Sequence, residues 1–211
     1  MKILVISDVH GNLPALEYVL NAEQHVDLTI SLGDVVGYGP WSNECVDLLD
    51  SLDQRVLVSG NHETAFLDGQ YPGSHPVALA FFDFCFSRFN RQKKISIYQA
   101  SYLKDNVEFV HTINDAYIFP DTEVSIHRDT FIGHSHRMFT KSVNGYALTN
   151  VGSVGQNRVN IDEINYAIWN TELNSVELIR KNFNVDYLIN EMQVQGYPEI
   201  CIDYIKSKRT L

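Results

Sequence analysis

Five short motifs of metal-binding residue types are spread over the first two thirds of the chain, and each of them follows a brief apolar run. The motifs are Asp8-Val9-His10, Gly33-Asp34, Gly60-Asn61-His62-Glu63, His111 and Gly133-His134-Ser135-His136. The runs before them, such as residues 3–6 and 56–58, have the length and the apolar side chains of strands. Loops at strand ends on a rigid sheet can meet at one place, so this pattern predicts one site that gathers carboxylates and imidazoles from distant segments.

The composition suits one folded domain with a large core. The chain has 211 residues, of which 45% are hydrophobic and 20% charged. We expect a single domain over residues 1–211, with a helical extension at about residues 184–209. No apolar run approaches the roughly 20 residues of a membrane span, and the amino terminus carries no signal pattern. The expectation is a cytoplasmic protein without membrane contact.

The net charge argues against nucleic-acid binding, and the cysteine spacing argues against a disulfide framework. The formal net charge of -10 disfavours stable nucleic-acid binding, which depends on Lys and Arg contacts to phosphates. It does not exclude a phosphate substrate, because bound divalent metals reverse the local sign of an acidic site. Cys45, Cys85 and Cys201 lie far apart without CxxC spacing, which predicts core residues and no disulfide framework.

The amino-terminal part alternates predicted strands and helices. Asn12 is placed to cap a helix that carries Pro14 in its first turn. Strands are predicted at 3–6, 28–32 and 55–59, and helices from residue 13 and at 42–52. This alternation is typical of a mostly parallel α/β sheet.

The second half has a different pattern. Residues 76–104 are helical in spacing, and residues 185–209 predict two short helices broken at Gly196-Tyr197-Pro198. Short strand-like runs lie at 107–110, 116–119, 130–132, 146–150, 166–169 and 175–179. They predict a second sheet with more antiparallel pairing. The predicted fold class is therefore α/β, with two facing mixed β-sheets flanked by helices in a four-layer αββα sandwich.

The acidic motifs suit metal binding. In an extended segment, Asp8 and His10 lie on one side of the chain and can reach one ion. Asp34 has two carboxylate oxygens, which suit a bridge between two cations. Each motif alone also has an ordinary explanation, as a capping or turn Asp or a surface His.

The remaining motifs add an amide and imidazoles. Asn61 can offer its amide oxygen to a metal, and His62 can hold a proton at neutral pH and give it to a leaving alkoxide. His62 could instead be a further metal ligand or a loop histidine. His134 and His136 follow a strand at i and i+2, as in a metal-binding turn, and His111 would supply another imidazole.

In order and spacing, these motifs resemble the signature of the calcineurin-like metallophosphoesterase superfamily: D-x-H, GD, GNH with a following acidic residue, H, and G-H-x-H. The resemblance covers roughly residues 1–158, and segments 33–40 and 150–156 are similar to the small prokaryotic YfcE-like phosphodiesterase branch. Two departures stand out. Thr112-Ile113 follows His111 where relatives commonly have a glycine, and Gly37-Tyr38-Gly39 replaces the Arg that follows GD in protein phosphatases.

The resemblance implies a two-metal hydrolase. One ion would be held by Asp8, His10 and His136, the second by Asn61, His111 and His134, with Asp34 bridging them. This ligand set suits Mn, Fe or Zn, with Mn favoured. A hydroxide bridging the ions would attack phosphorus, and His62 would protonate the leaving oxygen. Asp8 would also act in catalysis, oriented by a partner such as Ser7 or Asn12.

Substrate contacts are less visible in the sequence. Arg137 adjoins the last ligand, Arg158 follows a Gly-rich loop, and Asn61 lies at the site, so these three are the candidate substrate-binding residues. A small phosphodiester or nucleotide polyphosphate is favoured over a monoester. The Phe-rich segment 81–89 could cover the cleft and stack a base, although a core helix is the favoured interpretation.

Two other functions are compatible with the fold. A eukaryotic retromer subunit resembles it and serves mainly as an interaction scaffold, and a protein phosphatase is the third alternative. The complete set of seven ligands together with His62 favours an enzyme. The sequence leaves open the native metal, the physiological substrate and the oligomeric state, a homo-oligomer included.

Overall fold

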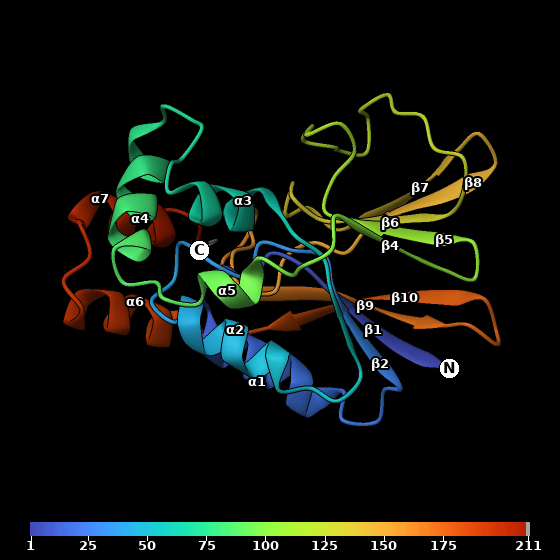
Figure 1. Ribbon diagram of the computed structural model, residues 1–211, viewed down its shortest axis with the longest axis horizontal. Helices are drawn as coiled ribbons and strands as arrows, with labels where there is room; N and C mark the ends of the chain where they lie inside the picture. The colour runs from blue at the N-terminus through green and yellow to red at the C-terminus, as the bar shows by residue number, and fades with distance from the viewer. Residues whose placement is uncertain (210–211) are drawn as a thin grey trace.

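The computed structural model describes residues 1–209 and contains two five-stranded sheets that face each other (Figure 1). The first sheet has the order β10-β9-β1-β2-β3. Its strands are β1 (Lys2–Ile6), β2 (Leu28–Ser31), β3 (Arg55–Leu57), β9 (Glu163–Asn170) and β10 (Ser175–Asn182). β1, β2 and β3 run parallel, whereas β9 pairs antiparallel with both β1 and β10. The parallel strands therefore end at the same edge of the sheet.

The second sheet has the order β4-β5-β6-β8-β7. Its strands are β4 (Ser101–Lys104), β5 (Val107–Val110), β6 (Thr130–Ile132), β7 (Phe139–Val143) and β8 (Tyr146–Asn150). β5, β6 and β8 run parallel, and the hairpin partners β4 and β7 close the two edges. This confirms the prediction of two mixed sheets flanked by helices.

Helices cover the outer face of the first sheet and gather at one end of the sandwich. They are α1 (Leu13–Ala22), α2 (Ser42–Asp50), α3 (Asn61–Asp68), α4 (Pro76–Phe86), α5 (Gln92–Ile95), α6 (Asp186–Val194) and α7 (Glu199–Lys206). The Asn12 side chain caps α1 by accepting the Ala15 N–H at 3.3 Å, as expected. Helices α4, α6 and α7 lie together on the left of Figure 1.

Successive side chains of β1 point to opposite faces of the first sheet, and a different layer covers each face. Ile3 and Val5 point between the sheets, whereas Leu4 and Ile6 point toward the helices, and all four are fully buried. A strand buried on both faces is apolar throughout, as a parallel sheet requires.

The outer face of the second sheet is covered by the loop between β5 and β6. Ile118 and Ile126 of this loop are buried against Ile132 of β6 and Leu148 of β8. This loop, which begins at the atypical Thr112-Ile113, is the fourth layer on that side.

Several local predictions were wrong. Residues 101–104 form β4 and no helix, because Asp105 and Asn106 adopt left-handed backbone and close a hairpin with β5. Residues 116–119 belong to the covering loop, and β7 was missed. β9 and β10 join the first sheet instead of the second, since β9 pairs with β1.

Other predictions were confirmed. Phe81, Phe82 and Phe89 are at most 6% exposed and lie in the largest apolar cluster, so the Phe-rich segment belongs to the core. The three cysteines are free and buried. Two short helices follow residue 185, with a break at residues 195–198. Within residues 1–209, no helix has the length and apolar character needed to cross a membrane.

Candidate metal centre

The seven candidate ligands all lie just beyond the carboxyl ends of parallel strands. Asp8 and His10 follow β1, Asp34 follows β2, and Asn61 begins α3 after β3. The remaining ligands come from the second sheet: His111 follows β5, and His134 and His136 follow β6. The two sheets bring these ends together, so residues more than 100 positions apart touch.

Five of these seven residues have left-handed backbone. They are Asp8 (φ 55°), His10 (φ 48°), Asp34 (φ 54°), His134 (φ 65°) and His136 (φ 57°). This conformation is unfavourable for residues with a Cβ, and it persists only where the surroundings impose it. Interloop hydrogen bonds do so here, for example from the Asp8 N–H to Gly33 O at 3.0 Å and from the His10 N–H to Asp34 O at 2.9 Å.

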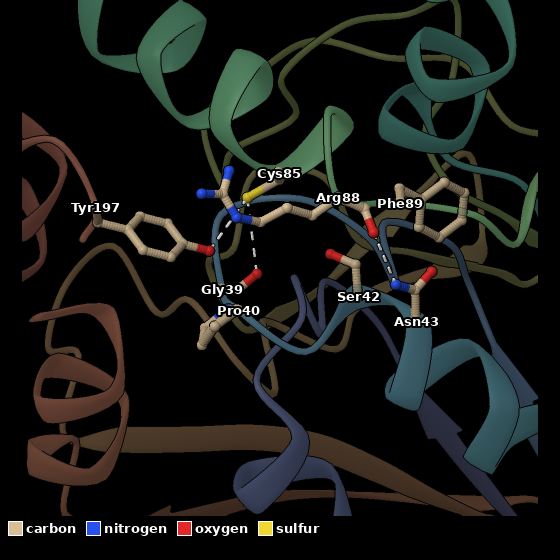
Figure 2. A pocket seen from close by; sticks show the side chains of 8 residues that line it. All are labelled: Gly39, Pro40, Ser42, Asn43, Cys85, Arg88, Phe89 and Tyr197. Carbon is tan, nitrogen blue, oxygen red and sulfur yellow. Dashed lines mark hydrogen bonds between the residues drawn. The ribbon is translucent and has the colours of Figure 1, made fainter. Parts of the chain in front are cut away.

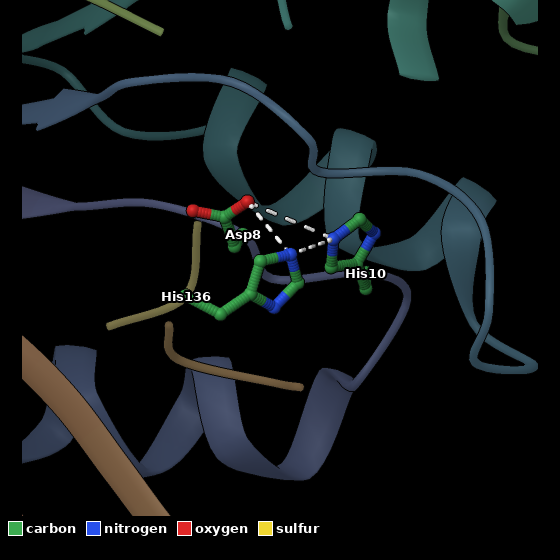
Figure 3. A group of neighbouring side chains, drawn as sticks. All are labelled: Asp8, His10 and His136. Atoms are coloured by element: carbon green, nitrogen blue, oxygen red, sulfur yellow. Dashed lines mark hydrogen bonds and ion pairs between the residues drawn. The ribbon is translucent and has the colours of Figure 1, made fainter. Parts of the chain in front are cut away.

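The first ligand cluster consists of Asp8, His10 and His136 (Figure 3). The Nε2 atoms of His10 and His136 are 3.3 Å apart, and their rings are stacked. Asp8 Oδ1 lies 3.2 Å from His136 Nε2 and 3.7 Å from His10 Nε2. All three side chains are buried and point at one another.

The second cluster is built around His111. Its Nε2 lies 3.0 Å from Asn61 Oδ1 and 3.1 Å from His134 Nδ1. Asp34 stands between the clusters, because its Oδ2 is 3.3 Å from His111 Nε2 and 3.8 Å from His10 Nε2. One carboxylate oxygen thus faces both groups.

The donor set fits metal ions. The Nδ1 atoms of His10, His111 and His136 each face a backbone carbonyl, of Val36, Leu32 and Gln156 respectively. A carbonyl only accepts, so Nδ1 carries the proton in the neutral ring and the Nε2 lone pair points into the cluster. Asp8 Oδ1 also has no hydrogen-bond partner among the described residues. Converging lone pairs and an orphaned carboxylate oxygen are the arrangement that a cation satisfies.

Charges within the site perturb its ionisation. Burial alone would raise the pKa of Asp34, but the imidazoles of His111 and His62 hold it well below its usual range. Burial would lower the pKa of His111, but Asp34 raises it to about 9. Burial raises the pKa of Asp8 to about 7. His111 and Asp34 therefore each favour the charged form of the other.

His62 lies beside both clusters. Its backbone N–H donates to Asp34 Oδ1 at 2.9 Å, and its ring centroid is 4.7 Å from that of His10. Its Nδ1 is buried without a partner in the described part of the chain. Burial lowers its pKa, against the opposing effect of Asp34. His62, His10 and Asp34 also form a group that could hold an ion, so the geometry is compatible with either an acid or a ligand.

Glu63 connects two loops of the site, a role that was not predicted from the sequence. Its buried carboxylate accepts the N–H groups of Asp34 at 2.7 Å, Val35 at 2.8 Å, Val36 at 3.2 Å and Gly60 at 2.8 Å. Burial raises the pKa of Glu63 to about 7, with Asp34 acting in the same direction and these hydrogen bonds opposing it. Glu63 lies three residues after the N-cap Gly60 and accepts its N–H, as the Glu of a capping box does, and this spacing could have revealed part of the role.

Two glycines allow the loops to approach. A Cβ at Gly60 would lie 2.2 Å from Asp34 Oδ1, and one at Gly133 would lie 1.9 Å from Ser7 Oγ and 2.6 Å from Asp8 Oδ2. Both contacts are impossible for a real side chain. The glycines of the GNH and GHSH motifs are therefore required by packing.

The loop after Asp34 is tied to the carboxyl-terminal helical segment (Figure 2). The Cys85 thiol lies 3.7 Å from Gly39 O and 3.3 Å from the Tyr197 hydroxyl. Asn43 of α2 donates to Arg88 O at 3.0 Å on the far side of the same hollow. Tyr38, which precedes Gly39 in this loop, has its ring centroid 4.8 Å from that of His10.

The sequence model of the calcineurin-like phosphoesterase family matches residues 1–199 of this chain. The chain belongs to this family. Members hydrolyse phosphoric esters and depend on metal ions, which agrees with the clustered Asp and His residues.

Individual family relatives cover nearly the whole chain. The uncharacterized protein MJ0912 of Methanocaldococcus jannaschii is 29% identical over 93% of this chain and 94% of its own length. A metallophosphoesterase from Sphaerobacter thermophilus is 26% identical, with a TM-score of 0.78 over 99% of this chain and 100% of that one. YfcE, a phosphoesterase from E. coli, shares the fold at 19% identity, with a TM-score of 0.52 over 87% of this chain and 100% of its own. The resemblance to YfcE thus extends to the fold.

The candidate substrate-binding residues of this phosphoesterase differ in setting. Asn61 lies in the second cluster, and Arg137 is exposed beside the last ligand. Arg158 is partly buried, and its Nε has no partner within residues 1–209.

The predicted orienting partner of Asp8 can be checked as well. The Asn12 side chain donates to Gly155 O at 3.1 Å, and Asp8 Oδ2 accepts the His134 backbone N–H at 3.0 Å. Asn12 is therefore occupied elsewhere and does not orient Asp8.

Proposed function

We propose that this chain is a binuclear metal-dependent phosphoesterase that hydrolyses phosphodiesters or nucleotide polyphosphates, with two Mn(II) ions as the favoured cofactors. The observation that carries the proposal is the pair of ligand clusters that share Asp34. Asp8, His10 and His136 would hold one ion and Asn61, His111 and His134 the other. Asp34 would be shared by the two ions, because its Oδ2 lies within 3.8 Å of the Nε2 atoms of both His10 and His111.

The ions, when bound, would supply an activated water for attack at phosphorus and would draw charge from the phosphoryl oxygens. The protein's own contribution is to hold the ligands in place. Backbone carbonyls keep the Nδ1 protons of His10 and His111, so that the opposite nitrogens stay free to ligate. Glu63 fixes the loop that carries Asp34.

His62 would donate a proton to the leaving oxygen, a contribution on the order of 10² to 10⁴ in rate. Its backbone bond to Asp34 and its contact with His10 keep the ring beside the reacting group. Asp8 would contribute to catalysis through its ligand role, with Oδ2 held by the His134 N–H. Arg158, Arg137 and Asn61 would bind the substrate.

The preference for a diester rests on the residues after Asp34. Gly37-Tyr38-Gly39 places no cation where protein phosphatases carry an Arg, so a phosphoprotein monoester is disfavoured. A scaffold function is disfavoured because all seven candidate ligands and His62 are present and lie together. We place the enzyme in the cytoplasm.

The test is metal-dependent hydrolysis. Purified protein stripped with a chelator should lose hydrolysis of bis(p-nitrophenyl) phosphate and regain it in Mn(II), with two metal equivalents bound. The rate with the diester should exceed that with p-nitrophenyl phosphate. Asp34→Asn should lower occupancy of both sites, whereas Asp68→Asn, an exposed carboxylate on α3, should leave metal content unchanged. Full activity in excess chelator would contradict the proposal.

A further inference from the structure

The only strongly exposed aromatic ring stacked on a candidate ligand within residues 1–209 belongs to Tyr117. Its ring centroid lies 4.1 Å from that of His134, with 21° between the planes, and the residue is 45% exposed. The Phe-rich segment cannot offer such a surface, because its rings pack in the core. Tyr117 was not singled out from the sequence.

The loop around Tyr117 is held in place by its own contacts. The Thr112 hydroxyl donates to Ala116 O, and Asn114 and Asp115 between them adopt left-handed backbone in a tight turn. Ile118, directly after Tyr117, is 1% exposed and anchors the loop on the second sheet. The ring is therefore presented at the metal centre in a fixed position, which reduces the entropy lost when a ligand binds.

The Arg158 guanidinium lies over the Tyr117 ring, and one of its donors has no partner among the described residues. Its guanidinium carbon is 5.5 Å from the Tyr117 ring centroid, and its Nε is buried without a partner in the described chain. The neighbouring Asn157 is fixed, since its side chain donates to Asn165 Oδ1 at 2.8 Å and accepts the Val159 N–H at 2.9 Å. A buried guanidinium donor without a partner is satisfied well by a phosphoryl oxygen.

The surroundings of Arg158 are aromatic and lack a competing carboxylate. The phenols of Tyr38, Tyr117 and Tyr204 are its electrostatic neighbours, and Tyr204 comes from α7. Arg158 takes part in no ion pair with an Asp or Glu of residues 1–209. Its positive charge is thus available to an anionic ligand.

We infer that Tyr117 and Arg158 form a nucleoside-phosphate subsite: the base stacks on the Tyr117 ring, and Arg158 binds a nonbridging oxygen of the phosphate. The inference rests on the proposed function, since it places that phosphate at the metal centre. Stacking on an aromatic face tolerates any base, so the subsite selects nucleotides as a class. A phosphate attached to a sugar without a base lacks this contact.

The experiment compares AMP with ribose 5-phosphate, which differs by the missing base. Both are titrated calorimetrically into the Mn(II)-loaded protein. AMP should bind about 10-fold more tightly, which corresponds to roughly 1.4 kcal/mol and lies within the range for one stacked base. Tyr117→Ala should abolish this difference, and Tyr117→Phe should retain it. Arg158→Gln should weaken both ligands by about 10-fold, because both carry the phosphate.

The controls separate this inference from a supporting role of Tyr117. Tyr187→Ala removes a 67% exposed tyrosine on α6 and should leave both affinities unchanged. Equal affinities of the unaltered protein for AMP and ribose 5-phosphate would overturn the subsite. So would an equal loss of both ligands in Tyr117→Ala, which would mean that the ring only supports His134. A protein that hydrolyses bis(p-nitrophenyl) phosphate without discriminating the two ligands loses only the subsite. If the protein discriminates AMP from ribose 5-phosphate but hydrolyses no ester, the hydrolase assignment is wrong and the subsite inference stands.

Discussion

The Glu63 carboxylate accepts the backbone N–H of Asp34 at 2.7 Å, although the two residues belong to different motifs. The same carboxylate caps α3 through the Gly60 N–H at 2.8 Å. The loop of the candidate bridging ligand is therefore fastened to the start of the helix that carries Asn61 and His62.

Glu63→Gln should destabilise the protein and reduce its metal content. A glutamine amide nitrogen cannot accept a hydrogen bond, and each Glu63 oxygen accepts two of the four buried N–H groups, so two of them lose their acceptor. The expected loss is about 1–3 kcal/mol of unfolding free energy. Urea unfolding and metal analysis measure the two effects. The exposed Glu44→Gln on α2 is the control and should change stability by less than about 0.5 kcal/mol.

Asp47 should contribute a small part of the unfolding free energy, and this contribution should be lost in acid. Its carboxylate pairs with Arg91 at 2.8 Å and Lys94 at 2.9 Å, and hydrogen bonding from Arg91 lowers its pKa to about 2. A pKa below the unfolded value of about 3.9 adds stability above that pH, which is lost as the pH falls toward the folded pKa. Because these groups are more than a third exposed, Asp47→Asn should cost less than about 1 kcal/mol at pH 7.

Unfolding of Asp47→Asn and the unaltered protein should be compared across this range. The difference between them should shrink between about pH 4 and pH 2, and also in high salt. A difference that stays constant over this pH range would show that the ion pairs do not carry the effect.

Phe82→Ala should reveal a core residue. Phe82 is 5% exposed and packs against Phe66 and Phe86, with centroids 5.4 and 5.2 Å away. The cavity should cost about 3–5 kcal/mol of unfolding free energy. The folded fraction should hydrolyse nucleotide and nitrophenyl esters with unchanged KM, because the ring packs within the apolar core. A stable variant with a raised KM for nucleotides alone would return Phe82 to the substrate site.

The convergence of the ligands could be predicted because each motif is contiguous and follows its own strand. Strand polarity then places Asp8 and Asp34 at one edge of the first sheet, and His111 at the facing edge of the second sheet. The sheet membership of β9 was not predictable in this way, since its pairing with β1 spans most of the chain and leaves no local periodicity. Tyr117 was missed for a related reason. Its position depends on a loop whose fold arises from the Thr112 turn and Ile118 burial, and neither has a periodic signature.

Gly60→Ala should disturb the site at a distance from its own chemistry. The new Cβ would lie 2.2 Å from Asp34 Oδ1 and 2.6 Å from the Asp34 nitrogen, so Asp34 must move. Metal occupancy should fall at both sites, because the displaced carboxylate is the proposed bridge. Gly145→Ala is a matched control: its Cβ meets no atom within 4 Å, although its φ of 86° adds local strain. Metal content equal to that of the unaltered protein would argue against Asp34 as a shared ligand.

His62→Gln should separate acid catalysis from ligation. If His62 protonates the leaving oxygen, its loss matters most for a poor leaving group, so hydrolysis of a nucleotide ester should fall by on the order of 10² to 10⁴. Bis(p-nitrophenyl) phosphate should be affected far less, since nitrophenolate leaves without a proton. Metal content should stay near that of the unaltered protein, because the first cluster retains Asp8, His10 and His136. Loss of one metal equivalent would instead identify His62 as a ligand, as its position beside His10 and Asp34 also permits.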